Sequence, residues 1–246
     1  MYVSIRAVAL RAVRHSDKHS ILSVWTAEQG RLALLLSNAS TPEARRRRAL
    51  CMPLALFEAE VNIIPGREIL PMRDVRPTLL THNTASHPVR SALAMFFAEV
   101  LTRLLRESGN ADTAMYDLIT DMVRDIDSLP EKRLANLHIL YLYRLAVVLG
   151  IAPDTDSWHP GALFSLTTGT FSASGRYAAK DEKVLDPAGS RLVWILGRLT
   201  RHNMHRLTMS RAERTAMLDT ILSYYTQHLT PMNGLRSLPV LTALSD

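Results

Sequence analysis

The sequence has a single cysteine and no long apolar run. Cys51 cannot form a disulfide within the chain, and this usage is typical of a reducing cytosol. No segment approaches the roughly 18 consecutive apolar residues that span a bilayer. The first 20 residues carry arginines inside their apolar stretch and lack a clean cleavage site, so we expect no signal peptide. We therefore expect a cytoplasmic protein with no membrane partner.

The common catalytic motifs are also missing. The chain has no G-x-x-x-x-G-K-[ST], no G-x-G-x-x-G, no H-E-x-x-H and no G-x-S-x-G. These absences predict a protein that is not an enzyme. A hydrolase or transferase with an unrecognised site stays open, and it would need a pocket in which titratable groups converge.

Metal ligands are scarce. A structural zinc site needs four cysteine or histidine ligands at close spacing, and Cys51 is the sole thiol. His202 and His205 lack a third partner nearby, so we interpret them as surface or phosphate-facing side chains. Asp121 and Asp125 are interpreted as a solvated helix face, and Cys51 as a packed small residue. We expect neither a metal nor another cofactor.

The chain has a net charge of +6, and the positive charge is concentrated in its N-terminal part. Residues 1–80 carry 12 lysines and arginines against 7 acidic residues. Residues 81–150 carry 7 against 8, and residues 151–246 carry 10 against 8. A local basic excess attracts phosphate backbones or acidic peptides. A solvated, arginine-rich surface is the alternative.

Residues 1–80 have the short period of β-strands. The segment 57–63 alternates apolar and polar residues, which predicts a strand with one buried face. Glu28-Gln29-Gly30 predicts a turn, with Gly30 suited to a positive φ. Pro71 suggests that the last strand lies at a sheet edge. Five strands and an intervening helix-like segment predict a small barrel of the OB type.

The period becomes helical beyond a polar segment at 81–88, which we interpret as a linker. Apolar stripes predict amphipathic helices around 93–104 and 115–126. Capping-box patterns at Ser128–Glu131 and Ser210–Glu213 predict two helix starts, the first opening a central apolar helix. We expect an irregular lobe at about 151–186, with short strands, then a helix at about 187–201. The predicted class is α+β and multi-domain, with an OB-fold domain at 1–80 and a helical domain at 81–246.

The tract Arg45–Arg48 is the sharpest local feature. Consecutive side chains fan out around a helix axis, so two at most would follow one groove. A basic loop beside an OB barrel suits single-stranded nucleic acid. Tyr2 and Trp25 are candidates for base stacking, although a core tryptophan is equally consistent with the pattern. The predicted DNA-binding residues are Arg11, Arg14, Lys18, Arg31, Arg45, Arg46, Arg47 and Arg48.

One arginine, Arg144, lies within the apolar helix that precedes Gly150. Burying its charge without a partner would be costly. We expect it to meet a carboxylate, either within the chain or from a partner peptide, and we favour the internal salt bridge.

Four segments in order resemble one bacterial family. They are SILSVWTAEQGRLALLL, ALCMPLALFEAEV, LHILYLYRLAVVLGIAP and the terminal NGLRSLPVL. Together they resemble the recombination-mediator family RecO across nearly the whole chain. No single segment is diagnostic, and the order and spacing carry the resemblance.

The chain departs from that family pattern in two places. Many members bind zinc through a cysteine cluster in the region that corresponds to 154–186, where this chain has no cysteine. Many also carry a small-Lys-Gly sequence after the second strand, where this chain reads Leu36-Ser37-Asn38. The basic function of that place would then lie in Arg45–Arg48.

The resemblance implies a recombination mediator in DNA repair. RecO-like proteins bind single- and double-stranded DNA and anneal complementary strands. They contact the acidic C-terminal tail of the single-stranded-DNA-binding protein (SSB), and they join RecR to load RecA. The resemblance thus implies a cytoplasmic, nucleoid-associated protein with these partners. A non-enzymatic adaptor that binds an acidic peptide and no nucleic acid is the alternative.

Overall fold

The computed structural model describes residues 2–105, 111–173 and 182–244. The chain divides into a first unit, Met1–Leu129 with Leu235–Leu244, and a second unit, Pro130–Gly234 with Ser245–Asp246. The division into 1–80 and 81–246 that the sequence suggested stays a prediction. Among the described residues, no helix is long and apolar enough to cross a membrane.

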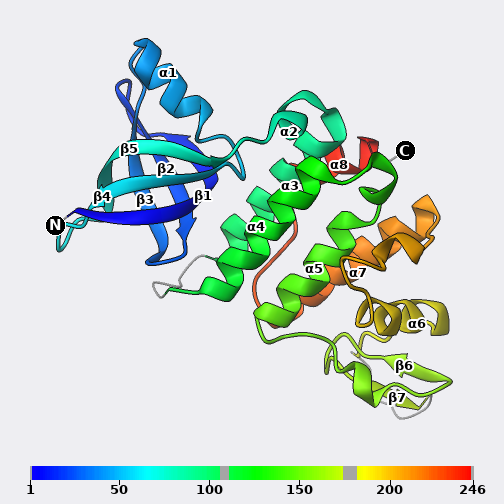
Figure 1. Cartoon of the computed structure of the whole chain (residues 1–246). Coiled ribbons are helices and arrows are strands. Elements are labelled where there is room, and N and C mark those ends of the chain that lie inside the picture. Colours follow the sequence, from blue (N-terminus) through cyan, green and yellow to red (C-terminus); the bar gives the residue numbers. More distant parts are fainter. Residues whose placement is uncertain (1, 106–110, 174–181, 245–246) are drawn as a thin grey trace. The chain divides into compact units, whose positions relative to one another are not determined.

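Five strands of the first unit close into a barrel, in the order β1-β2-β3-β5-β4 (Figure 1). Strands β3 and β5 pair in parallel, and the other neighbours are antiparallel. The turn between β2 and β3 contains Gly30 at φ 64°, as the sequence predicted. With the helices that follow, this barrel confirms the predicted α+β class and its OB-type barrel. The strands are β1 Tyr2–Arg14, β2 His19–Thr26, β3 Gly30–Ser37, β4 Leu56–Asn62 and β5 Ile69–Leu79, with helix α1 Pro42–Ala49 between β3 and β4.

Alternating side chains of these strands fill the barrel. In β4, Phe57, Ala59 and Val61 are buried while Glu58 is exposed, which confirms the predicted alternation. Their partners in the core include Ile5, Leu22, Val24 and Leu34.

The edge position predicted for the strand with Pro71 is wrong. Pro71 pairs with Leu35 of β3, and the next residue, Met72, pairs with Val61 of β4. Barrel closure gives every strand two neighbours, so no edge remains. Pro71 is tolerated because it takes the last pair of a three-residue parallel ladder, where little pairing is lost.

Helices α2 to α4 and α8 complete the first unit. The predicted linker at 81–88 contains helix α2, and Asp127 accepts hydrogen bonds there from the N–H and hydroxyl of Thr84. Both amphipathic stripes are confirmed, because their apolar residues are buried. Asp125 is fully buried, which corrects its assignment to a solvated face: it lies one turn from Met122 on the apolar stripe. The helices are α2 His82–Ser86, α3 Pro88–Leu104, α4 Thr113–Ser128 and α8 Leu238–Leu244.

The second unit is built around the apolar helix α5, which ends before Gly150 at φ 72°. Two short strands in the expected lobe confirm that part of the prediction, and residues 174–181 of the lobe lie outside the described residues. The helix expected at about 187–201 ends at Leu196. The elements are η1 Glu131–Arg133, α5 Leu137–Val148, η2 Thr155–Ser157, β6 Ala162–Phe164, β7 Phe171–Ala173, α6 Pro187–Leu196, η3 Met204–Arg206 and α7 Arg211–His228.

The two predicted capping boxes have different outcomes. Ser210 and Glu213 cap α7 reciprocally, as predicted. Ser128 caps nothing, because α4 continues through it and its hydroxyl donates to the carbonyl of Arg124. Helix α5 starts later, after Asn136.

Candidate nucleic-acid interface

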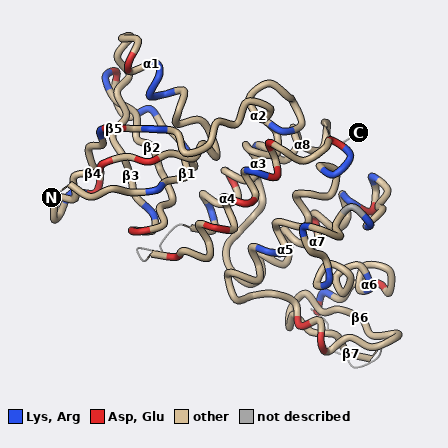
Figure 2. The backbone as a smooth tube through the Cα atoms, viewed as in Figure 1, with Lys and Arg blue, Asp and Glu red and all other residues tan. Residues whose placement is uncertain are grey.

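The arginine tract lies on helix α1 (Figure 2). Thr41 starts this helix by accepting a hydrogen bond from the N–H of Ala44, and Pro42 follows in the first turn. Each successive arginine is turned by about 100° around the axis. The four guanidinium groups therefore have different environments.

Two of the four arginines are held by the protein. Arg48 donates from Nη1 to the carbonyls of Ser37 and Ala39, each at 2.9 Å. Arg47 forms a 3.0 Å ion pair with Glu43. Arg45 and Arg46 are exposed, and the described residues give neither guanidinium group a hydrogen bond or ion pair. These two cations are therefore available to an outside anion.

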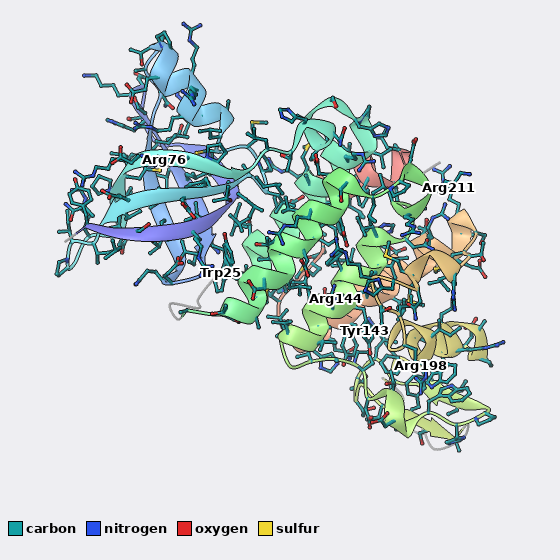
Figure 3. The ribbon with its side chains drawn as sticks, viewed as in Figure 1. Trp25, Arg76, Tyr143, Arg144, Arg198 and Arg211 are labelled. Atoms are coloured by element: carbon teal, nitrogen blue, oxygen red, sulfur yellow. The ribbon has the colours of Figure 1, made fainter. Side chains whose placement is uncertain are left out.

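A groove of about 260 Å³ lies between α1 and β5. Three of its lining residues are arginines and two are acidic, so its lining is positive on balance. Arg46 and Arg76 are exposed at its wall, and Figure 3 labels Arg76. The lining residues are Glu43, Arg46, Arg47, Leu50, Asp74, Val75 and Arg76. The groove offers an anion two exposed guanidinium groups from different elements.

A bulge in β5 sets the direction of its arginines. The register with β4 shifts between Glu58 and Glu60, and Asp74 opposite has a positive φ of 52°. Arg73 forms a 2.6 Å ion pair with Glu60 and lies 3.8 Å over the ring of Tyr2. Arg73 and Arg76 were not predicted as DNA-binding residues from the sequence. Only a bulge places two arginines three residues apart on the outside of one strand.

The hairpin between β1 and β2 lies at the same end of the barrel as α1. Asn38 donates from its N–H to the carbonyl of Lys18 at 2.8 Å, and its side chain donates to the carbonyl of Ser16. Its neighbours Ser37 and Ala39 are the residues that hold Arg48. The structure thus brings the exposed Arg14 and Lys18 near α1. Arg14 itself pairs with Asp17 at 2.7 Å, and Arg11 is exposed further along β1.

Arg31 lies apart from these residues. It is the second residue of β3, six residues before Ser37, which is about 20 Å along a strand. Its guanidinium donates to the carbonyls of Thr102 and Leu105 at the end of α3. This capping role explains its position without nucleic acid.

The two aromatic candidates for base stacking differ in their exposure to solvent. Trp25 is 1% exposed, so it is a core residue and cannot stack on a base. Tyr2 is 45% exposed, and Arg73 covers one face of its ring. Tyr2 therefore stays a candidate for stacking.

Two buried titratable groups are not among the residues that line the groove. Burial raises the pKa of the Cys51 thiol to about 12, against a smaller effect of Arg47, which confirms a packed cysteine. Burial and the nearby charge of Arg214 lower the pKa of His138 to about 4, so this histidine is neutral at pH 7. Within the described ranges, no three His, Cys, Asp or Glu side chains come together as metal ligands.

Arg144 in the second unit is half-buried and lies 5.5 Å from the ring centre of Tyr141 (Figure 3). The internal salt bridge predicted for it is not found within the part of the chain that the structure describes. Partial exposure lets water solvate the guanidinium, so no carboxylate is required. His202, also in the second unit, is exposed, and the side chain of His205 lies outside the described residues.

Comparison with known proteins identifies the family. Residues 85–239, more than half of the chain, match the family described as Recombination protein O C terminal. The chain is 28% identical over 239 residues to a DNA repair protein RecO from Bacteroides fragilis, covering 97% of each. It is 29% identical over 252 residues to one from Porphyromonas gingivalis, covering 100% of each, and 23% identical over 243 residues to one from Flavobacterium psychrophilum, covering 98% of each. The chain therefore belongs to the RecO family, as its four sequence segments predicted.

Proposed function

We propose that this chain is a recombination mediator in DNA repair, and that its barrel, residues 1–80, is the DNA-binding domain. The observation that carries the proposal is the groove between α1 and β5, with Arg46 and Arg76 exposed at its wall. OB-type barrels commonly bind single strands beside such basic elements. Membership of the RecO family agrees with this role.

The proposed activity is strand annealing without nucleotide hydrolysis or other catalysis. Two complementary strands are polyanions, so their approach requires neutralisation of phosphates. Exposed arginines at one end of the barrel supply that charge to single-stranded and double-stranded DNA alike. We place this activity in the cytoplasm, at the nucleoid.

The proposed protein partners are RecR, the acidic C-terminal tail of SSB, and RecA indirectly. An acidic tail requires a positive and partly apolar surface. Arg144 and Val147 lie one turn apart on α5, with Arg144 half-buried and Val147 53% exposed. They make α5 our candidate for the tail.

Binding of labelled oligo(dT) at several salt concentrations tests the DNA-binding proposal. We expect Arg46→Ala with Arg76→Ala to weaken binding. We also expect the double change to reduce the slope of log affinity against log salt by about 1.4, since each phosphate contact on a single strand contributes about 0.7. The control is Arg124→Ala, which removes an exposed arginine from α4 of the same unit.

An unchanged slope in the double variant would remove the groove from the site. Failure of the unchanged protein to bind any DNA at low salt would overturn the proposal. In that case, binding of an acidic peptide would favour the adaptor function.

A further inference from the structure

Three planar groups of the second unit are stacked on one another. Trp158, which follows η2, stacks on Trp194 of α6 with ring centres 4.2 Å apart and planes 25° apart. The guanidinium of Arg198 lies 4.0 Å from the centre of the Trp194 ring. Two groups this close to one ring centre must occupy its opposite faces. The stack therefore runs Trp158, Trp194, Arg198; Figure 3 labels Arg198.

The outer layer of this stack faces solvent and is held in place. Arg198 is exposed, while both tryptophans are half-buried. The Nη1 atom of Arg198 donates to the carbonyl of Trp194 at 3.3 Å. Gly197 lets the end of α6 approach η2 closely, because a Cβ there would lie 2.5 Å from Cγ2 of Thr155. Arg198 thus presents one guanidinium face outward from a fixed support.

The surrounding chain is strongly basic. Residues 187–214 contain six arginines and one acidic residue, Glu213. Lys and Arg appear along α6 and towards the start of α7 in Figure 2. Arg191, Arg198 and Arg206 are exposed. A flat cationic face within a basic surface suits a ligand that combines planar rings with phosphates.

We propose that the outward face of Arg198, supported by the ring of Trp194, is a stacking site for an unpaired nucleobase, with neighbouring arginines contacting the adjoining phosphates. Unstacked bases pack on aromatic rings and on guanidinium planes. The partner is single-stranded nucleic acid, because bases within a duplex are already stacked. An acidic peptide would need only the positive charge of the arginines and not a planar face, so the charge-conserving Arg198→Lys variant distinguishes the two ligands. The inference rests on the proposed DNA-binding function and adds a second contact, in the other unit.

The test measures binding of oligo(dT) and of a duplex to the full-length Arg46→Ala, Arg76→Ala protein, in which the barrel contributes less. We expect Arg198→Ala to weaken oligo(dT) binding by about tenfold, within the range found for loss of one stacked base. Duplex binding should change by less than about twofold. Arg198→Lys keeps the charge but removes the planar face, so it should weaken oligo(dT) binding nearly as much.

Arg124→Lys, at an exposed position of α4 in the first unit, is the matched control, because Arg124 lies outside the proposed stacking site. It should bind like the parent protein. Photocrosslinking of oligo(dT) that carries 5-iodouracil should label the peptide that contains Trp194. Thermal unfolding of each variant checks that the fold is intact.

Wild-type binding by Arg198→Lys would show that the positive charge at this position is sufficient, and it would overturn the stacking site. An equal loss of oligo(dT) and duplex binding in Arg198→Ala would overturn it as well. If Arg46→Ala with Arg76→Ala weakens binding but Arg198→Ala does not, this inference fails while the proposed function stands. If the unchanged protein binds no nucleic acid, both fail.

Discussion

The carboxylate of Glu99 accepts hydrogen bonds from both the N–H and the hydroxyl of Ser237, at 2.9 and 2.6 Å. It also accepts one from the N–H of Arg236 at 3.0 Å. Glu99 lies in α3, and Ser237 directly precedes α8. These contacts hold the C-terminal helix in the same unit as the barrel.

Loss of the Glu99 charge should destabilise the first unit. We expect Glu99→Gln to lower the free energy of unfolding by about 1 to 2 kcal/mol, because hydrogen bonds to a charged acceptor weaken. Urea unfolding monitored by circular dichroism measures this change. Glu68→Gln, at an exposed position, should have almost no effect. Equal stability of the two variants would contradict the role of Glu99.

The pH dependence of stability should carry the signature of Glu99. Burial alone would raise the pKa of its carboxyl, but the hydrogen bonds of Ser237 and Arg236 and the charge of Arg103 lower it below the ordinary 4.5. A native pKa below the unfolded one stabilises the fold above about pH 4.5. That stabilisation is lost as the pH falls through the native pKa. Glu99→Gln should flatten the decline in stability on acidification, and an unaltered decline would argue against this assignment.

Arg31 should prove structural. Arg31→Gln removes the donor to the carbonyls of Thr102 and Leu105, so we expect a lower melting temperature. The folded variant should bind oligo(dT) with the salt slope of the unchanged protein. A slope reduced as in the groove variant would show instead that Arg31 contacts phosphate.

Asn38 should affect DNA affinity by positioning the β1–β2 hairpin, since its side chain carries no charge. Asn38→Ala removes the side-chain hydrogen bond to the carbonyl of Ser16 and so loosens the β1–β2 hairpin beside the segment that holds Arg48. We expect a few-fold loss of DNA affinity with little change in salt slope, since every cation is kept. Arg45→Ala should instead reduce the slope by about 0.7. Wild-type affinity of Asn38→Ala would show that the hairpin is not part of the interface.

Cys51 should be unreactive in the folded protein. With a pKa of about 12, roughly one thiol in ten thousand is ionised at pH 8, and the thiolate is the reactive form. Iodoacetamide should label Cys51 slowly under native conditions and rapidly in urea. Mass spectrometry of the modified protein follows both rates. Rapid native labelling would contradict its burial.

Local patterns were sufficient to predict most of the fold. Alternation in 57–63 and the turn at Gly30 predicted the barrel strands, because a half-buried strand has a period of two residues. Apolar stripes predicted α3 and α4, because one face of a helix recurs about every 3.6 residues. The prediction failed where structure beyond the local pattern decides the outcome. Barrel closure overrode the edge signal of Pro71, and the continuation of α4 overrode the capping pattern at Ser128.

The candidate interface was predicted in part. The tract Arg45–Arg48 is visible in the sequence, but its division into held and exposed arginines depends on the carbonyls that Arg48 reaches. Arg76 joins the groove through a bulge that sequence patterns do not reveal. The contacts of Arg31 could not be predicted from a local pattern, since its partners are 71 and 74 residues away.

Annealing of two complementary oligonucleotides, each coated with SSB, tests the central claim most directly. The reaction is followed without ATP, using SSB with and without its acidic tail. We predict that the protein accelerates annealing, and that removal of the tail abolishes the acceleration. Absence of any acceleration, together with absence of DNA binding at low salt, would contradict the proposed recombination mediator.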